Sequence, residues 1–277
     1  MRCPATVFIQ RCAQFREAVI ESRLTLEKSL GKVKHAKLGC ETIPMKISLF
    51  GIHDIVSGKH NVKDPRLDQA DQLVKADKKI YAQVDALGED GALEADVLLT
   101  TREGLPDLIL KDLEFVETRL TREPPAPEKA VLLRIKGLLE GERGLFAAGL
   151  SPEELRAVAA HSFYTNKPMV VAEPEELQHP DALIVRAFKE SGYICYLTVG
   201  GKENRAWPIR KGATAWEAAA AIHTDLQKGF IRAEIISFDD FIQAGGETQA
   251  KRAGKLRLET KNYIMQDYDV VNFRFSK

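Results

Sequence analysis

The chain has 277 residues, an ordinary apolar content of 44% and 40 basic against 40 acidic residues, so its formal net charge is zero. This length predicts one large or two modest domains, each able to bury a core. No run of about 18 apolar residues is present, which excludes a membrane-spanning helix. The four cysteines show no C-x-x-C spacing, so we expect reduced thiols rather than a disulfide scaffold.

Residues 1–44 come before the first strand signal. Residues 15–30 lack Gly and Pro and carry charge pairs at helical spacing, which is compatible with a helix. Two interpretations stay open for this region. It is either an extension with little tertiary support, in which case Met45 is the original start, or an added docking helix. A proteolytic fragment that begins near residue 45 favours the extension.

Residues 45–51 predict the first strand of a nucleotide-binding sheet, and a candidate phosphate loop follows. A Walker A loop reads G-x-x-x-x-G-K-[ST], because backbone N–H groups wrap the phosphates, Lys neutralises charge and the hydroxyl holds Mg²⁺. Here Gly51 and Gly58 are two residues too far apart, and His60 follows Lys59 where the hydroxyl is needed. Asp54 adds a negative charge inside the loop. This pattern predicts a loop that does not bind a triphosphate in the usual way.

Residues 79–85 predict a strand that ends in Asp85-x-x-Gly88. The spacing D-x-x-G is similar to the element that approaches Mg²⁺ and the γ-phosphate in GTPases. Only residues 89–94 separate it from the next predicted strand, at 95–101. The intervening segment is therefore too short for a switch that becomes ordered on a γ-phosphate.

The next region predicts helices that fold back on one another. Apolar residues recur at helical spacing over 107–122, and Pro124-Pro125 must end that helix. A second helix is expected over 128–140. Ser151, followed by Pro152 and Glu154, predicts a capping box that opens a third. A strand after Lys167 and a helix over 180–191 then lead to the last third of the chain.

The last third begins with two alternating runs, 193–199 and 205–210, which predict a hairpin that turns at Gly200-Gly201. Pro208 cannot donate to a ladder, so its strand should lie at an edge near that residue. Thr214 and Glu217 form a capping box that opens an Ala-rich helix. Further strands are expected at residues 231–238, 256–258 and 270–275. This order is that of a small β-grasp domain.

The C-terminal residues resemble the TGS domain of the YchF family of Obg-like ATPases. The resemblance rests on the run HTDLQKGFIRAE at residues 223–234, and DPRLDQADQLVK at residues 64–75 is similar to another family segment. The resemblance covers the whole module almost without gaps, and one departure stands out. Tyr268 stands where the family usually has Gly, which carries a steric cost if that turn needs a positive φ.

The resemblance also implies where this chain departs from a working nucleotide cycle. In the family a long switch segment precedes the strand at 95–101, and here only residues 89–94 remain. The family's base-recognition loop reads N-x-x-E. Glu173 stands at the Asn position and cannot donate the hydrogen bonds of an amide, whereas Glu176 keeps the acid.

We therefore predict an α/β fold with a reduced P-loop GTPase-like parallel sheet, an inserted helical arm and a C-terminal β-grasp (TGS) domain. The expected division is an extension over 1–44, a degenerate G-like domain over 45–192 with its arm at about 105–163, and the TGS domain over 193–277. The arm is either a binding surface, as in the family, or a solvated spacer.

The function favoured is a non-catalytic, cytoplasmic adaptor that associates with RNA or the ribosome, with no membrane partner, small-molecule substrate, catalytic residue or metal site identified. The alternative is a divergent NTPase that retains weak binding or hydrolysis of Mg-ATP or Mg-GTP. The candidate nucleotide-binding residues are Gly51, Gly58, Lys59, Asp85, Gly88 and Glu176. The candidate RNA-binding residues are Lys202, Arg205, Arg210, Lys211, Lys228 and Arg232, with Trp207 or Phe230 for base stacking.

Overall fold

The computed structural model describes residues 45–276. The helix expected over residues 15–30, and the choice between an extension and a docking helix, lie outside the described residues. Within them the chain forms two compact units, which are described separately. The first holds residues 46–57 and 86–178, and the second holds Met45, 58–85 and 179–276. The domain boundary expected at residues 192 and 193 stays a prediction, and residues 58–85 group with the C-terminal part of the chain.

Parallel strands form the centre of the first unit, because short and almost wholly apolar segments favour strands that are buried on both faces. β1 pairs in parallel with β5, and β5 pairs in parallel with β6. The order of the whole sheet is β2-β4-β1-β5-β6, and the boundary between the two units falls inside β4. These strands are β1 (Met45–Phe50), β2 (Gly58–Asn61), β4 (Gln83–Leu87), β5 (Val97–Thr101) and β6 (Met169–Ala172).

The single strand expected over residues 79–85 is two strands in two sheets. β3 (Lys78–Ile80) pairs in parallel with a strand of the C-terminal sheet, whereas β4 belongs to the first sheet. Tyr81 and Ala82 lie between them, and the Ala82 carbonyl accepts a hydrogen bond from the N–H of Val62 at 2.8 Å. Alternating polarity cannot reveal such a break, because tertiary contacts decide which strand each segment joins.

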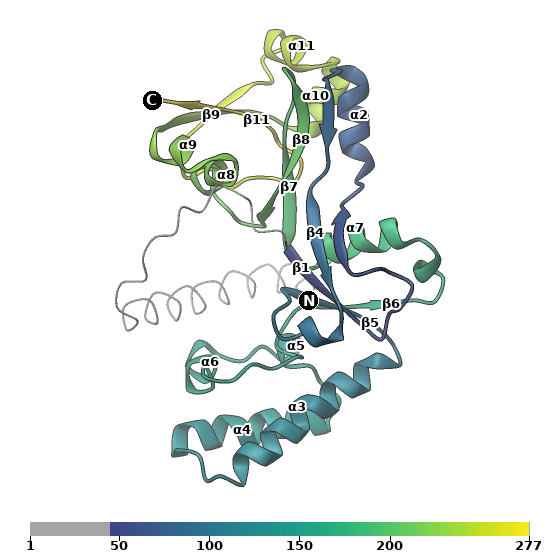
Figure 1. Cartoon of the computed structure of the whole chain (residues 1–277). Coiled ribbons are helices and arrows are strands. Elements are labelled where there is room, and N and C mark those ends of the chain that lie inside the picture. The colour runs from purple at the N-terminus through teal and green to yellow at the C-terminus, as the bar shows by residue number, and fades with distance from the viewer. Residues whose placement is uncertain (1–44, 277) are drawn as a thin grey trace, which may run out of the picture. The chain divides into compact units, whose positions relative to one another are not determined.

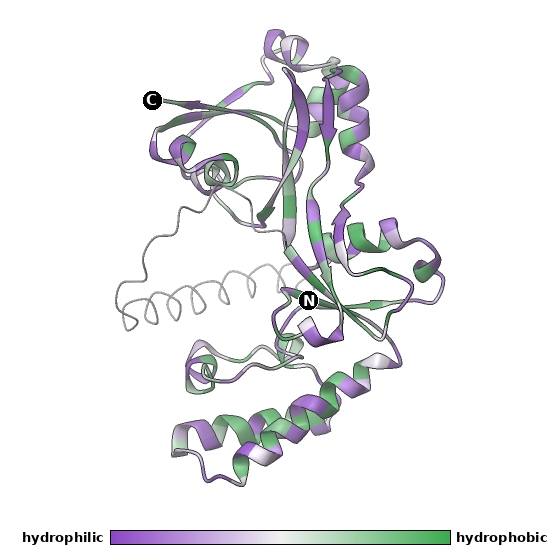
Figure 2. Cartoon of the chain, in the orientation of Figure 1, coloured by the Kyte–Doolittle hydropathy of each residue, from purple (hydrophilic) through white to green (hydrophobic). Residues whose placement is uncertain are grey.

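A helical arm is inserted between β5 and β6, as expected. Its two long helices bury apolar residues against each other, among them Val116 of the first and Leu132 and Ile135 of the second. Hydrophilic and hydrophobic residues alternate along both (Figure 2), which is the pattern of amphipathic helices. The arm comprises α3 (Gly104–Leu120), α4 (Ala126–Glu140), α5 (Leu145–Ala148) and α6 (Pro152–Ala157).

The second unit is built on a six-stranded sheet in the order β10-β9-β11-β7-β8-β3, of which Figure 1 labels β9, β11, β7 and β8. The predicted hairpin is β7 (Tyr193–Thr198) with β8 (Glu203–Arg210), and β11 (Val270–Phe275) lies beside β7 in parallel. β3 pairs with Glu203–Arg205 of β8, and this pairing does not extend to Pro208. The strand β8 is therefore at an edge near Pro208, as expected for a residue that cannot donate a backbone hydrogen bond. The remaining elements are α2 (Pro65–Leu73), α7 (Pro180–Glu190), α8 (Ala215–Ile222), α9 (Thr224–Lys228), β9 (Phe230–Ile236), α10 (Phe238–Ala244), α11 (Glu247–Arg252) and β10 (Arg257–Glu259).

The helix α8 packs its alanines against one face of this sheet. Ala218 and Ala219 are fully buried with Trp207 and Phe273, and the Tyr196 hydroxyl donates to the Ala218 carbonyl at 2.9 Å. Small side chains let the helix approach the strands closely, so the aromatic residues fill the remaining space. The expected capping box at Thr214 is present with both of its hydrogen bonds. This arrangement is the β-grasp order that the sequence predicts.

The segment 58–85 joins the second unit through a buried ion pair. Asp64 is 2% exposed, and both its carboxylate oxygens accept from the Arg66 guanidinium at 3.0 and 2.8 Å. Arg66 also donates to Asp267 at 2.7 Å and lies 3.6 Å over the ring of Tyr268. Tyr268 has φ 65°, so the turn does need the positive φ that disfavours a Tyr. Its ring contact with the guanidinium offsets part of that cost.

Candidate functional site

The carboxyl ends of the parallel strands meet at one edge of the first unit, which is where α/β sheets bind ligands. Gly51 follows β1, and its N–H donates to the Glu89 carboxylate at 3.0 Å. Gly88 follows β4, and its carbonyl accepts from the Ser48 hydroxyl at 3.3 Å. Two candidate nucleotide-binding residues, Gly51 and Gly88, are thus brought to the same edge. The N–H group of Gly51 is therefore already hydrogen-bonded to a carboxylate of the chain itself.

The other glycine and the lysine of the candidate phosphate loop are placed differently. Gly58 and Lys59 are the first two residues of β2, and both belong to the second unit. A phosphate loop connects a strand to a helix whose N-terminus faces the anion. Here β1 is followed by β2, and the next helix of the described residues begins only at Pro65. Lys59 is exposed on its strand.

Asp85 and Glu176 complete the candidate nucleotide set. Asp85 lies within β4, half-buried and three residues before Gly88. Glu176 begins a short 3₁₀ helix after β6, and its carboxylate accepts from the Glu173 N–H at 2.9 Å. Glu173 in turn forms an ion pair with Arg102 at 3.1 Å. These side chains therefore order the loop that follows β6.

The edge is strongly acidic. The only Lys or Arg among the residues that follow these strand ends, 51–57, 88–90, 102–103 and 173–178, is Arg102. Carboxylates accumulate there, and a triphosphate brought to them would meet like charge, because Arg102 is already paired with Glu173. The acidic residues of these segments are Asp54, Glu89, Asp90, Glu103, Glu173, Glu175 and Glu176.

Two of the six candidate RNA-binding cations lie over aromatic rings in the second unit. The guanidinium of Arg205 is 3.9 Å from the ring of Trp207 and 3.7 Å from the Glu203 carboxylate. The guanidinium of Arg210 is 4.0 Å from the ring of Tyr193, its partner across the hairpin. Five residues apart on β8, the two arginines point to opposite faces of the sheet. Trp207 is 7% exposed, so it does not offer a free face for stacking.

The remaining four cations are exposed, and they come from separate elements. Lys202 lies in the β7–β8 turn, Lys211 follows β8, Lys228 ends α9, and Arg232 lies on β9 opposite Arg274. The structure therefore distributes the six cations over both faces and the turns. Phe230 is half-buried, and Trp216 is the exposed tryptophan, at 44%.

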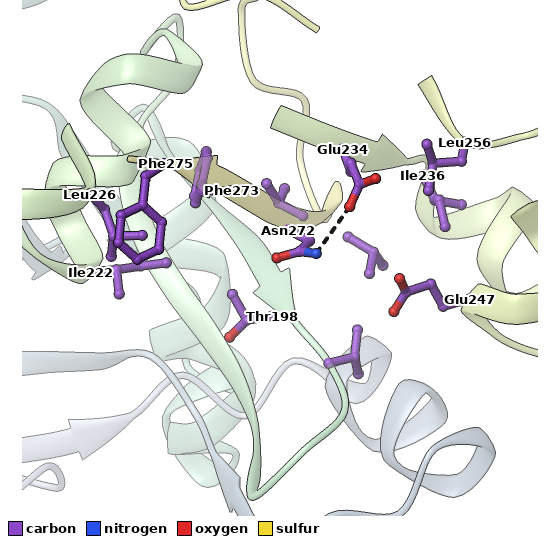
Figure 3. A pocket seen from close by; sticks show the side chains of 13 residues that line it. Thr198, Ile222, Leu226, Glu234, Ile236, Glu247, Leu256, Asn272, Phe273 and Phe275 are labelled. Atoms are coloured by element: carbon purple, nitrogen blue, oxygen red, sulfur yellow. Dashed lines mark hydrogen bonds between the residues drawn. The ribbon is translucent and has the colours of Figure 1, made fainter. Parts of the chain in front are cut away.

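A cavity in the second unit was not anticipated from the sequence. It lies beside β11 and includes Glu234, Glu247 and Asn272 (Figure 3). Glu234 is 7% exposed among the buried apolar residues Ala233, Ile235 and Ile236 of β9. A charged residue within such a run is the signal that could have pointed to it, because a buried carboxylate requires partners.

Two kinds of feature are absent from the part of the chain that the structure describes. No helix of residues 45–276 is long and apolar enough to cross a membrane. In the same residues no cluster of three or more His, Cys, Asp and Glu side chains is suited to hold a metal ion.

Comparison with known proteins gives matches of three kinds. Residues 193–276 match the family model YchF-GTPase_C, described as a protein of unknown function (DUF933). The ribosome-binding ATPase YchF of Haemophilus influenzae is 34% identical over 232 residues, which cover 61% of this chain and 64% of that protein. The YchF of Pasteurella multocida is 58% identical over 94 residues, covering 34% of this chain and 26% of that protein. The structure of the Schizosaccharomyces pombe YchF GTPase aligns with a TM-score of 0.67 at 19% identity, covering 88% of this chain and all of that one.

The fold and its strand-end loops define a reduced GTPase-like α/β sheet with a helical insertion, joined to a β-grasp module. The family model and the curated relatives indicate which known proteins this architecture resembles. Residues 193–276 therefore match a C-terminal domain of the YchF family, and the chain as a whole is similar to curated YchF proteins. It spans 64% of the length of the H. influenzae relative.

Proposed function

We propose that this chain is a non-catalytic adaptor of the cytoplasm that associates with RNA or the ribosome and carries a degenerate nucleotide site. Support for the ribosome comes from relatives named ribosome-binding ATPases. In this proposal the C-terminal unit acts as a TGS domain and is the module that attaches to the partner. The family match to residues 193–276 supports this assignment. In this proposal Lys202, Arg205, Arg210, Lys211, Lys228 and Arg232 contribute positive charge from several positions.

The hydrogen bond between Gly51 and Glu89 carries the proposal of a degenerate site. A phosphate loop needs free N–H groups that converge on the anion, together with a helix N-terminus behind them. Here the first of these N–H groups donates to a carboxylate at 3.0 Å, and a strand follows the loop instead of a helix. The residues present therefore do not fit a triphosphate at this edge. The carboxylates at the strand ends add repulsion to the missing donors.

Calorimetric titration with Mg-ATP and with Mg-GTP tests this half of the proposal. We expect no saturable heat with the wild-type chain and none with Lys59→Ala. A bound nucleotide at 100 times its dissociation constant would add about 2.7 kcal/mol to the free energy of unfolding, so a thermal shift serves as a second readout. Hydrolysis that Lys59→Ala abolishes would replace the adaptor by the alternative, a divergent NTPase.

Co-sedimentation with ribosomes and titration with single-stranded RNA at several salt concentrations test the other half. We expect binding that weakens steeply as salt rises, because cations release counterions from phosphates. The double variant Lys211→Glu and Lys228→Glu should reduce the salt slope by about 2, or about 1 for each cation. The same reversal at Lys129, an exposed residue of the arm, should leave the slope unchanged. No binding of either partner at low salt would refute the proposal.

A further inference from the structure

The second unit contains a cavity of 360 Å³ that lies along β11 (Figure 3). Val270, Asn272 and Val271 all line it, although successive residues of a strand point to opposite faces of the sheet. A cavity bounded by both sets of side chains lies at the edge of a strand and not on one face. Thr198 and Val199, where β7 ends, also line it.

The strand pairing explains why there is space at this edge. β11 pairs with β9 from Val270 to Phe275, but in the described residues its pairing with β7 consists of Val270 with Leu197 alone. The two parallel strands therefore separate after one pair. A strand edge opened in this way can accept a further extended chain, which is a recurrent mode of peptide recognition.

The two ends of the cavity differ in chemistry. Phe275, Leu226 and Ile222 gather at one end (Figure 3) and form an apolar wall. Glu234 and Glu247 lie toward the other end. A ligand that fills the cavity must therefore combine an apolar group with a polar one.

The polar end offers mainly acceptors. The Asn272 amide N–H donates to Glu234 at 3.0 Å, which leaves the Asn272 carbonyl oxygen as an acceptor. Arg274 also donates to Glu234 and offsets its charge, so the exposed carboxylate of Glu247 is the remaining charge. The Thr198 hydroxyl accepts from the Trp207 indole at 2.9 Å. Acceptors and a net negative charge select a cationic donor and disfavour phosphate.

We propose that this cavity binds an extended segment of a partner polypeptide in which Lys or Arg lies two residues from an apolar residue. Alternate residues of a strand point the same way and lie about 6.8 Å apart, so both side chains can enter the cavity. The cation pairs with Glu247 and donates to Asn272, and the apolar side chain packs on Phe275. This site recognises protein and is separate from the proposed RNA contacts.

Selection from a displayed library of random heptapeptides on the full 277-residue protein tests the site. We expect enrichment of sequences with a basic residue two positions from an aromatic or aliphatic one. The same selection on Glu247→Lys should lose this motif, and Glu175→Lys, an exposed glutamate of the first unit, should retain it. Thermal unfolding of each variant verifies that the fold is intact.

Calorimetry with a selected peptide, synthesised with capped termini, measures each contribution. We expect Glu247→Lys and Phe275→Ser each to weaken binding by about 10-fold or more, and Glu247→Gln by less. Enrichment of acidic peptides, no enrichment at all, or equal affinity for Glu247→Lys would overturn the proposal. So would an oligoribonucleotide that protects the amides of residues 270–275 from hydrogen exchange in place of the peptide.

Discussion

The two units of this protein differ in which parts of their folds are complete. In the first unit the parallel strands are present, but the segments at their carboxyl ends are short, acidic and hydrogen-bonded to one another, as Gly51 is to Glu89. In the second unit the sheet, its crossing helix and its turns form a complete β-grasp. Strands persist because burial alone maintains them, whereas ligand chemistry depends on loops whose length and polarity burial does not protect.

The largest effect that we predict concerns the ion pair of the second unit. Arg66→Ala leaves the Asp64 carboxylate buried beside Lys189 alone and removes the cation from the ring of Tyr268. We expect the free energy of unfolding of this unit to fall by roughly 3 to 5 kcal/mol. Both tryptophans, Trp207 and Trp216, lie in the second unit, so fluorescence during urea unfolding reports on it selectively.

The matched control is Arg122→Ala, an exposed arginine of the first unit, which should change stability by no more than about 0.5 kcal/mol. Equal effects of the two substitutions would mean that residues 58–85 are not held to the second unit by this ion pair. The difference in stability between the two units would then have to be explained by other contacts.

Acid distinguishes the units in the second prediction, through the buried Asp64 of the second unit and the buried Asp112 of the first. Burial raises the pKa of Asp64, but the hydrogen bonds from Arg66 and Lys189 outweigh it and lower the pKa to about 2 from the ordinary 3.8. A lowered folded-state pKa stabilises the fold above pH 3.8, and this stabilisation is lost as pH falls toward 2. We expect the second unit to lose about 2 kcal/mol over that window. Asp64→Asn should flatten the dependence in urea titrations followed by tryptophan fluorescence.

Asp112 of the first unit should behave in the opposite sense. It is 2% exposed and accepts from both N–H groups of Tyr164 and Thr165 at 2.8 Å. Burial nevertheless raises its pKa, because its partners are neutral. The first unit should therefore lose stability as pH rises from 3.8 through that raised pKa, and Asp112→Asn should remove the loss. Hydrogen exchange at the amides of residues 164 and 165 measures it.

The third prediction uses two capping boxes of the same chemistry. Thr214 and Glu217 cap α8, whose alanines lie in the core, and Ser151 and Glu154 cap α6, which has no buried residue. We expect Thr214→Ala to cost about 1 kcal/mol of the second unit's stability and Ser151→Ala only a few tenths. Thermal unfolding measures the first and hydrogen exchange over residues 152–157 the second. Equal global losses would show that α6 is as integral to its unit as α8.

Local signals in the sequence were sufficient for much of the fold. The boxes at Thr214 and Ser151 and the hairpin around Gly200 depend on a few neighbouring residues, and all are present. The division of residues 79–85 between two sheets could not be read in this way. It depends on partners more than 100 residues away, as β3 pairs with Glu203–Arg205.

The candidate sites were predictable only in part, for the same reason. Spacing predicted a phosphate loop that does not bind a triphosphate in the usual way, but it could not show that Lys59 lies on a strand or that Glu89 bonds to Gly51. A list of cations likewise does not tell which face each occupies, and Arg205 and Arg210 diverge on β8. The cavity beside β11 arises where two strands part, which no local pattern records.

The smallest effect that we predict tests the proposal that the edge of the first unit does not bind a nucleotide. Glu89→Ala removes one exposed hydrogen bond from Gly51 and should cost about 0.5 to 1 kcal/mol, as measured by chemical unfolding. Asp90→Ala, at the neighbouring exposed residue, is the control. Neither variant should gain protection of the Gly51 amide from Mg-ATP in hydrogen exchange, because a strand at Gly58 still replaces the helix that a phosphate loop requires. Protection acquired by Glu89→Ala alone would mean that a carboxylate occupies a site that still works. The contrast between the two sheets would then be one of regulation and not of loss.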